Sequence, residues 1–240
     1  MKIHRFFLNN PLGEELEIKE KGFLHQWNNV LKFKIGEDLI LFNSQQPVDY
    51  IYKIKELKKN IAKLILVDKR ENLIQEKEGR KVNLCISLIK KDNLDLILEK
   101  CTEIGVLEFT PIVTERVEKK NIASFNKERG EKTIIEAVEQ TGWGTIPKLY
   151  TPTKIENLLK ELENKNELEN IAILDIDENN KEEKNFKSNE KTYILIGPEG
   201  GWTENERNLF RKYKLKPISF GKNTLRAETA ALIASFVFFK

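Results

Sequence analysis

The sequence predicts an α/β protein with a small N-terminal β-barrel and a larger C-terminal domain built on a parallel sheet. Residues 1 to about 70 contain several short apolar runs with partial period-two alternation and little helical periodicity, a pattern typical of a small barrel. From Val82 onward, apolar runs alternate with amphipathic helical stretches, and strands joined by helices form parallel sheets. We therefore expect domains at 1–70 and 71–240, with a charged linker at about 68–81.

The composition is that of a soluble globular protein. The 240 residues are 33% charged and 40% hydrophobic, with a net charge of +3. The sequence has no apolar span long enough to predict a transmembrane helix, and the apolar run at its start is too short for a signal peptide. Cys85 and Cys101 are expected to be buried free thiols in a reducing cytoplasm. With two His and two separated Cys, we expect no metal site and no contact with a membrane.

The N-terminal domain is expected to contain one helical turn and several strands. The turn lies at about 24–30, and the clearest strands are at 39–42, 50–54 and 61–67. The charge run at 68–81 is expected to be solvated surface rather than a dedicated RNA patch.

The second domain is expected to begin as strand, helix, strand. Asp92 or Asn93 can cap the helix and Gly105 ends it. Its apolar positions fall on one stripe, formed by Leu94, Ile97, Leu98, Cys101 and Ile104. The elements expected in this domain are strands at 82–89, 106–113, 171–176 and 193–196, helices at 125–141, 154–165 and 227–239, and a polar surface loop at 177–190.

A glycine-rich turn follows the strand at 193–196. Its sequence is Gly197-Pro198-Glu199-Gly200-Gly201-Trp202. Thr203 and Glu206 then form a capping box, which predicts the start of a helix. A glycine-rich turn between the carboxyl end of a strand and a helix is where open α/β sheets bind small ligands. The glycines alone also fit a purely structural turn.

A second stretch repeats this arrangement near the C-terminus. An apolar strand ends near Gly221, a short loop follows, and an almost wholly apolar helix begins near Ala227. Arg226 stands at the start of that helix, where a positive charge opposes the helix dipole. Its position therefore indicates a role outside the helix. A helix that is apolar all round belongs in a core or at a subunit interface.

Several ligand-binding signatures are missing from the sequence. Neither turn has the Gly-Lys-Ser/Thr ending of a phosphate loop. No Gly-x-Gly-x-x-Gly follows a strand, which argues against a nicotinamide oxidoreductase. No Gly-x-Ser-x-Gly elbow is present, which argues against an esterase.

The two motifs together resemble the RsmE family of 16S ribosomal RNA uridine-N3 methyltransferases, in the SPOUT superfamily. The first is the turn at 197–202, and the second is Leu225-Arg226-Ala227-Glu228-Thr229-Ala230. Matches at residues 5–7 and 136–142 extend the resemblance over nearly the whole chain. Three positions depart from the family pattern: Asn43 replaces a Gly, Gly130 a Trp and Trp143 an Arg. Trp143 is expected to pack rather than to stack on a base.

The resemblance implies an N-terminal PUA-like barrel that contacts RNA and a trefoil-knotted C-terminal domain. It also implies S-adenosyl-L-methionine as the cofactor, 16S rRNA of the small ribosomal subunit as the substrate, a homodimer, and a cytoplasmic location.

We expect three groups of site residues. Arg226 is the candidate for stabilising the uridine anion, and Glu199 is a weaker candidate for the base, because it can equally well fix its own turn. The expected cofactor-binding residues are Leu174, Ile196, Gly197, Pro198, Glu199, Gly200, Gly201, Phe220, Gly221, Leu225, Arg226 and Ala227. The expected RNA-binding residues are Arg5, Arg116, Gln140 and Asn223.

Two alternatives stay open at this point. One is a SPOUT methyltransferase with another RNA target, such as a ribose 2′-oxygen. The other is a ribosome-assembly factor that binds RNA without catalysis, for which neither glycine motif would be needed.

Overall fold

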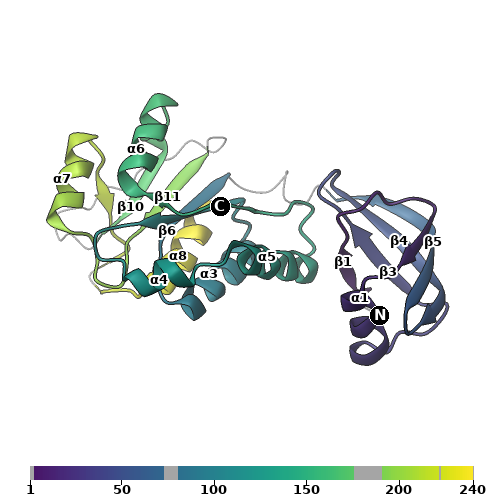
Figure 1. The fold of residues 1–240 in the computed structure, drawn as a ribbon. Helices are drawn as coiled ribbons and strands as arrows, with labels where there is room; N and C mark the ends of the chain where they lie inside the picture. The colour runs from purple at the N-terminus through teal and green to yellow at the C-terminus, as the bar shows by residue number, and fades with distance from the viewer. Residues whose placement is uncertain (1–2, 73–80, 176–190, 222, 240) are drawn as a thin grey trace. The chain divides into compact units, whose positions relative to one another are not determined.

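The computed structural model describes residues 3–72, 81–175, 191–221 and 223–239. By its internal contacts the chain divides into two compact units, Met1–Lys77 with Val138–Thr145 and Glu78–Ala137 with Ile146–Lys240. Each unit contains one sheet (Figure 1). The expected domains at 1–70 and 71–240 differ from these units at residues 71–77 and 138–145, which belong to the first unit by their contacts.

The first unit is a five-stranded mixed sheet in the order β1-β3-β4-β5-β2. Strand β1 pairs with β3 in parallel, and the remaining pairs are antiparallel. The sheet surrounds an aromatic core in which Trp27 is fully buried and lies 5.4 Å from the ring of Phe6. The elements are β1 (Arg5–Phe7), β2 (Glu15–Ile18), α1 (Lys21–His25), a π-helical turn (Gln26–Val30), β3 (Asp38–Phe42), β4 (Val48–Lys58) and β5 (Ile61–Glu71).

The three strands predicted in this unit are confirmed; β3 is one residue longer than predicted, and the other two are several residues longer. Strands β4 and β5 form a hairpin of two 11-residue strands. The predicted linker at 68–81 is wrong for its first residues, because Asp68 and Arg70 belong to β5 and pair with Ile51 and Asp49. Charged side chains fit there because this end of β5 is exposed to solvent. Residues 73–80 of the predicted linker lie outside the described part of the chain.

The second unit is built on a parallel sheet in the order β12-β10-β11-β6-β7-β8, and β9 also pairs with β7. Every pair in it is parallel, as the alternation of strands and helices predicts. Its strands are β6 (Val82–Ser87), β7 (Glu108–Val113), β8 (Lys148–Leu149), β9 (Thr153–Lys154), β10 (Ile171–Leu174), β11 (Thr192–Ile196) and β12 (Pro217–Ile218). Its helices are α3 (Lys91–Ile104), α4 (Lys119–Ser124), α5 (Lys127–Thr141), α6 (Ile155–Asn164), α7 (Glu204–Lys212) and α8 (Ala227–Phe239), with a short 3-10 turn at Leu168–Asn170.

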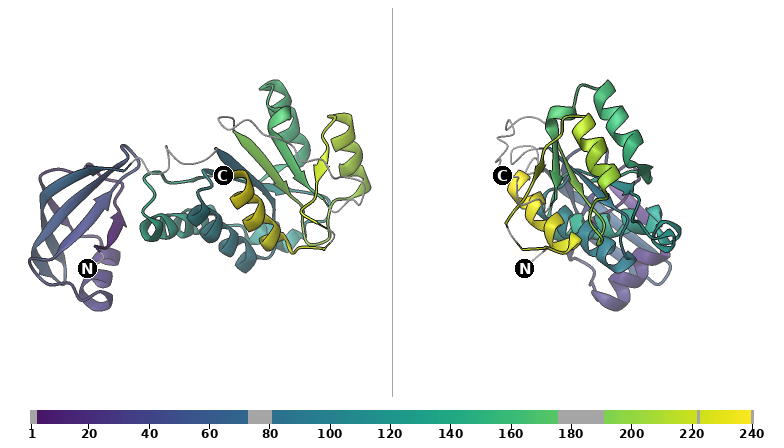
Figure 2. Two further views of the ribbon diagram at one scale, coloured as in Figure 1. Left: turned by 180° about the vertical axis from the view of Figure 1, so that it is seen from behind. Right: turned by 90° about the vertical axis from the view of Figure 1, so that its left-hand side faces the viewer.

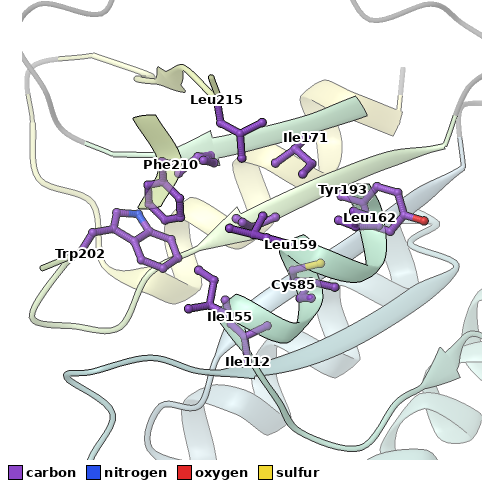
Figure 3. Packing of buried hydrophobic residues seen from close by; sticks show 13 residues of the cluster. Cys85, Ile112, Ile155, Leu159, Leu162, Ile171, Tyr193, Trp202, Phe210 and Leu215 are labelled. Carbon is purple, nitrogen blue, oxygen red and sulfur yellow. The ribbon is translucent and has the colours of Figure 1, made fainter. Parts of the chain in front are cut away.

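Helices cover both faces of this parallel sheet. Helices α6 and α7 pack on one face, and α3 and α8 lie against the other (Figures 1 and 2). Alternate residues of the strands, such as Cys85, Tyr193 and Leu195, join one buried cluster with side chains of α6 and α7 (Figure 3). All five residues of β11 are buried, as expected for a central parallel strand.

Helix boundaries show where the sequence predictions were wrong. Helix α3 begins at Lys91 after Lys90, and no side chain caps it, so the predicted cap at Asp92 or Asn93 is wrong. Backbone bonds from Asn93 and Leu94 to the Lys90 carbonyl already start the helix. The helix predicted at 125–141 begins at Lys127, and the separate helix α4 before it was not predicted. The loop predicted at 177–190 lies outside the described residues.

Helix α8 matches the predicted boundaries at Ala227 and Phe239. One side of it is buried in the unit, while Ile233, Phe236 and Val237 are exposed. Within the described residues, no helix combines the length and the apolar character needed to cross a membrane. Cys85 and Cys101 are buried free thiols, as predicted, and burial raises the pKa of each to about 12.

Candidate active site

A cavity of about 660 Å³ opens where several parallel strands of the second unit end. Leu174, Ile196 and Ile218, which are the last residues of β10, β11 and β12, line it. These strands are neighbours in the sheet, so their carboxyl ends meet at one edge. Open parallel sheets bind small ligands at this edge.

The turn at 197–202 forms the first wall of the cavity. It is closed by a hydrogen bond of 2.8 Å from the Gly201 N–H to the Pro198 carbonyl. Gly201 has a φ of +69°, which favours glycine. A Cβ atom at Gly197 would lie 3.1 Å from the ring of Trp202, so a larger residue would fit there only if the ring shifted slightly.

Trp202 fastens this wall to the core. Its side chain is 1% exposed and meets Phe210 of α7 edge to face, with ring centroids 5.1 Å apart (Figure 3). The indole Nε1 donates a hydrogen bond of 2.8 Å to the Leu174 carbonyl at the end of β10. The predicted capping box is confirmed next to it, because Thr203 and Glu206 exchange hydrogen bonds of 2.7 and 3.2 Å. The first wall is therefore held by strand β10 and helix α7.

Residues 219–221 and 223–226 form the second wall. The Ser219 hydroxyl donates 2.8 Å to the Gly221 carbonyl, and Gly221 has a φ of +134°. The Phe220 side chain is 37% exposed. The Arg226 carbonyl accepts from the Ala230 N–H in the first turn of α8, while the Arg226 side chain is 86% exposed. This wall projects charged and aromatic groups instead of burying them.

Positively and negatively charged side chains line the cavity. Asp175 and Arg207 form a two-bond ion pair of 2.7 and 3.1 Å, and the Asp175 side chain is almost fully buried. Sequence reasoning missed this pair, although a polar residue directly after a buried strand was a usable signal. The charged residues that line the cavity are Lys90, Asp175, Glu199, Arg207, Arg226 and Glu228. This balance fits a ligand that itself carries both charges.

The residues predicted to bind the cofactor come together in this structure. All twelve line the cavity, and so does Asn223. Glu199 is exposed, and its Oε1 lies 3.5 Å from the Lys90 N–H that donates to it. The Arg226 guanidinium lies 4.0 Å from the Glu228 carboxylate. Arg116 does not line the cavity, but its Nη1 donates to the Gly200 carbonyl of the first wall. The roles assigned to these residues stay predictions.

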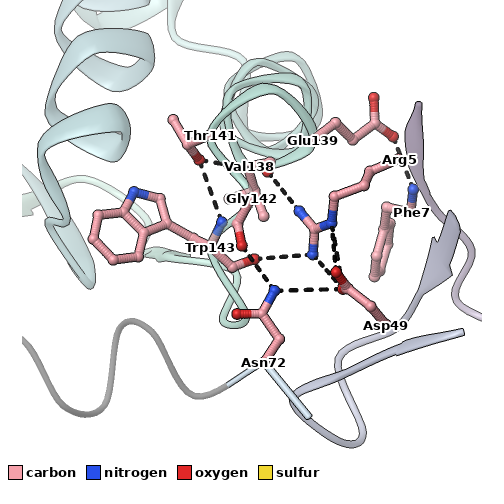
Figure 4. A network of polar contacts seen from close by, with 9 residues as sticks. All are labelled: Arg5, Phe7, Asp49, Asn72, Val138, Glu139, Thr141, Gly142 and Trp143. Atoms are coloured by element: carbon pink, nitrogen blue, oxygen red, sulfur yellow. Dashed lines mark hydrogen bonds and ion pairs between the residues drawn. The ribbon is translucent and has the colours of Figure 1, made fainter. Parts of the chain in front are cut away.

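Arg5 and Gln140 belong to the first unit and lie elsewhere. Arg5 is 8% exposed and forms an ion pair of 2.7 Å with Asp49 (Figure 4). It also donates to the carbonyls of Val138 and Trp143 and lies over the Phe42 ring. Its guanidinium thus holds residues 138–143 within the first unit. Contact of Arg5 with RNA stays a prediction, as does contact of the exposed Gln140.

The sequence of this chain is similar to those of RNA methyltransferases. A family model described as an RNA methyltransferase domain matches residues 75–238. The chain is 32% identical to the ribosomal RNA small subunit methyltransferase E of Rickettsia conorii, over 98% of this chain and 94% of that protein. It is also 32% identical to the protein of the same name from Aquifex aeolicus, over 75% of this chain and 80% of the relative.

Solved structures share the fold. A methyltransferase of Legionella pneumophila, solved with bound S-adenosyl methionine, superposes with a TM-score of 0.85 at 26% identity, over 99% of this chain and 97% of that one. Ribosomal RNA small subunit methyltransferase E of Neisseria gonorrhoeae was also solved with bound S-adenosyl methionine. It superposes with a TM-score of 0.81 at 24% identity, over 98% of this chain and 96% of that one. The similarity therefore includes both units.

Proposed function

Because the chain belongs to the ribosomal RNA small subunit methyltransferase E family of the SPOUT superfamily, we propose that it transfers a methyl group from S-adenosylmethionine to N3 of a uridine in 16S rRNA. The observation that carries this proposal is the convergence of both glycine motifs on one cavity. The two motifs are about 20 residues apart in the sequence, yet their backbones face the same space at the edge of the parallel sheet.

The cavity fits the cofactor in size and in chemistry. Its volume of about 660 Å³ lies within the range typical of small-molecule sites. Leu174, Ile196 and Phe220 offer apolar surface for an adenine ring, and the turn backbone offers amide groups. Glu199 and Glu228 offer negative charge that favours a nearby sulfonium. When bound, the cofactor supplies a methyl group on a positively charged sulfur.

The chain's own groups then have two tasks. The walls would hold the methyl donor close to the uridine nitrogen, and alignment of the two reacting groups supplies much of the rate enhancement in transfers of this kind. The N3 proton must also leave the uridine. Arg226, exposed beside the cavity, is the candidate for stabilising the resulting anion, and Glu199 is the candidate acceptor for the proton.

The substrate contacts and the assembly are part of the same proposal. Arg116 and Asn223 lie at or beside the cavity and are assigned to the RNA, together with Arg5 and Gln140 of the first unit. The exposed apolar residues Ile233, Phe236 and Val237 on α8 support a homodimer through this helix. A cytoplasmic location follows from the proposed rRNA substrate.

The test of the function is mass-spectrometric nucleoside analysis of 16S rRNA from cells with and without this gene. We expect 3-methyluridine to disappear without the gene and to return with the wild-type copy. Loss of a ribose-methylated nucleoside instead would move the target to a 2′-oxygen. An unchanged set of methylated nucleosides would favour an RNA-binding factor without catalysis.

Arg226→Ala tests the assignment of the cation. Its side chain is 86% exposed, so we expect unchanged stability; the cofactor Kd is measured in parallel, because Arg226 also lines the cavity. Turnover should fall by roughly 100- to 1,000-fold, as when a single anion-stabilising group is removed. Arg226→Lys, the matched control, keeps the charge and should retain more activity. Wild-type turnover by Arg226→Ala, with normal cofactor affinity, would show that the catalytic assignment is wrong.

A further inference from the structure

Glu206 forms a hydrogen bond that its role in helix capping does not require. The residue is 3% exposed, and its two carboxylate oxygens have different partners. Oε2 accepts 2.7 Å from the Thr203 N–H, which closes the capping box at the start of α7. Oε1 accepts 2.9 Å from the N–H of Glu115, a residue 91 positions earlier in the chain. The second bond therefore connects α7 to the segment that follows β7.

The segment at 114–116 is held at three further points. The buried Thr114 hydroxyl lies 3.5 Å from the hydroxyl of Ser87, at the end of β6. The Asn205 side chain donates 3.1 Å to the Glu115 carboxylate. The Arg116 Nη1 donates to the Gly200 carbonyl in the first wall of the cavity. This short segment is thus fixed between the sheet, helix α7 and the glycine turn.

These contacts set the place of the Arg116 guanidinium. A Cβ atom at Gly200 would lie 3.2 Å from the Arg116 Cδ, so the arginine stem lies directly across the turn. Arg116 is exposed, and within the part of the chain that the structure describes its hydrogen bond to Gly200 uses Nη1. Its Nε and Nη2 groups can face an anion that approaches the cavity, such as a phosphate.

We propose that Glu206 is a positioning residue for the RNA substrate. It acts through the Glu115 backbone, and it sets Arg116 at the cavity rim to bind a phosphate of the strand whose base enters the cavity. This inference rests on the proposed function. The capping box alone explains the bond to Thr203, whereas the bond to Glu115 holds a different, substrate-facing segment.

Glu206→Gln separates the two roles. Gln is accepted at this position of a capping box, so its oxygen can keep the bond to Thr203. Its amide nitrogen cannot accept the Glu115 N–H, so the second bond is lost. Thr203→Ala is the matched control. It removes the hydroxyl that accepts from the Glu206 N–H and weakens the start of α7, but it leaves the bond between Glu206 and Glu115 in place.

The experiment uses the full chain with small ribosomal subunits that lack the methyl group. We compare the wild type with Glu206→Gln, Arg116→Ala, the double variant and Thr203→Ala. Calorimetry gives the cofactor Kd, and incorporation of labelled methyl gives kcat and KM for the subunit. We expect Glu206→Gln and Arg116→Ala each to raise KM about tenfold, the size of one charged contact, with the cofactor Kd unchanged.

The double variant decides whether Glu206 acts through Arg116. We expect its KM to be no higher than that of Arg116→Ala alone, because the two changes remove the same interaction. Thr203→Ala should lower the unfolding midpoint without raising KM. Additive losses of about 100-fold, an equal rise of KM in Thr203→Ala, or a weakened cofactor Kd in Glu206→Gln would each overturn the proposal.

Two other outcomes are an unfolded Glu206→Gln variant and an inactive wild type. If Glu206→Gln does not fold, Asn205→Ala loosens the same segment from an exposed position, and KM should rise about threefold. An unchanged KM in that variant would count against the proposal. If the wild type methylates no subunit at all, the proposed function fails, whereas an active wild type with additive variants overturns only the role of Glu206.

Discussion

The turn at 197–202 and the described residues of the second wall, 219–221 and 223–226, face the same cavity, and the first is held to the core by more buried contacts. The first has a buried indole, a hydrogen bond to the end of β10 and a complete capping box behind it. The second has a local hydrogen bond from Ser219 to Gly221, a partly exposed Phe220, and an Arg226 side chain that is exposed to solvent. Both walls contain glycines in backbone conformations with positive φ.

We expect the two walls to have different tasks. A wall that is already ordered gives affinity because little conformational entropy is lost when a ligand binds. A wall with few buried contacts opens at a lower free energy and can close over the ligand. The first wall therefore fits the part of a preformed cofactor platform. The second fits a cover that brings Arg226 to the substrate.

Trp202→Ala is expected to have the largest effect. It removes a side chain that is 1% exposed and leaves a cavity under the turn. We expect the free energy of unfolding to fall by about 3–5 kcal/mol, with cofactor binding lost. Urea unfolding and calorimetry measure the two effects. The matched control is Trp202→Phe, which keeps a ring but loses the Nε1 donor to Leu174, at about 1–3 kcal/mol. A Trp202→Ala protein of wild-type stability would contradict the fastened first wall.

Gly201→Ala and Gly221→Ala compare the walls directly. Both positions have positive φ, and both have open space where a Cβ would be added. Strain alone would cost about 1–3 kcal/mol at either site. We expect Gly201→Ala to lose stability in this range, because its turn cannot move away from Trp202. The exposed loop around Gly221 can relax, so Gly221→Ala should weaken cofactor binding with a smaller loss of stability. Equal losses in thermal unfolding would remove the distinction.

Phe220→Ala should have the smallest effect on stability. Its ring is partly exposed and lies 6.4 Å from the ring of Phe238. We expect a change in unfolding free energy within about 0.5 kcal/mol, typical of surface positions, and a cofactor Kd that rises several-fold. Ser219→Ala, which removes only the small bond within the loop, is the control for loop order. A large loss of stability in Phe220→Ala would place this wall in the core.

Local sequence patterns predicted the parts of the site that depend on neighbouring residues. The capping box at Thr203 and Glu206, the buried strand β11 and the boundaries of α8 each follow from a few adjacent side chains, and the structure confirms them. The glycine spacing also located both walls. A knot in the second unit has no such local signal, because general topology rules disfavour it; it was expected from family resemblance alone and stays a prediction.

Long-range partners account for most of what the sequence did not predict. Arg5 was assigned to RNA, but its nearest acceptors are on Asp49, Val138 and Trp143, up to 138 residues away. The second oxygen of Glu206 likewise finds a partner 91 residues away. No spacing rule gives such pairs. The start of α3 was misplaced because Asp92 has the chemistry of a cap, whereas Lys90 is the residue at the cap position, two residues earlier.

Amide hydrogen exchange of the full chain, with and without S-adenosylmethionine, tests the unequal walls most directly. Exchange reports local opening segment by segment. We predict slow exchange for amides of the first wall, including Gly201, in both states, because that turn is closed and anchored. Residues 219–227 should exchange fast alone and become protected with the cofactor. Fast exchange in the first wall without cofactor, or no cofactor-dependent protection at 219–227, would contradict a cofactor cavity with one preformed wall and one closing wall.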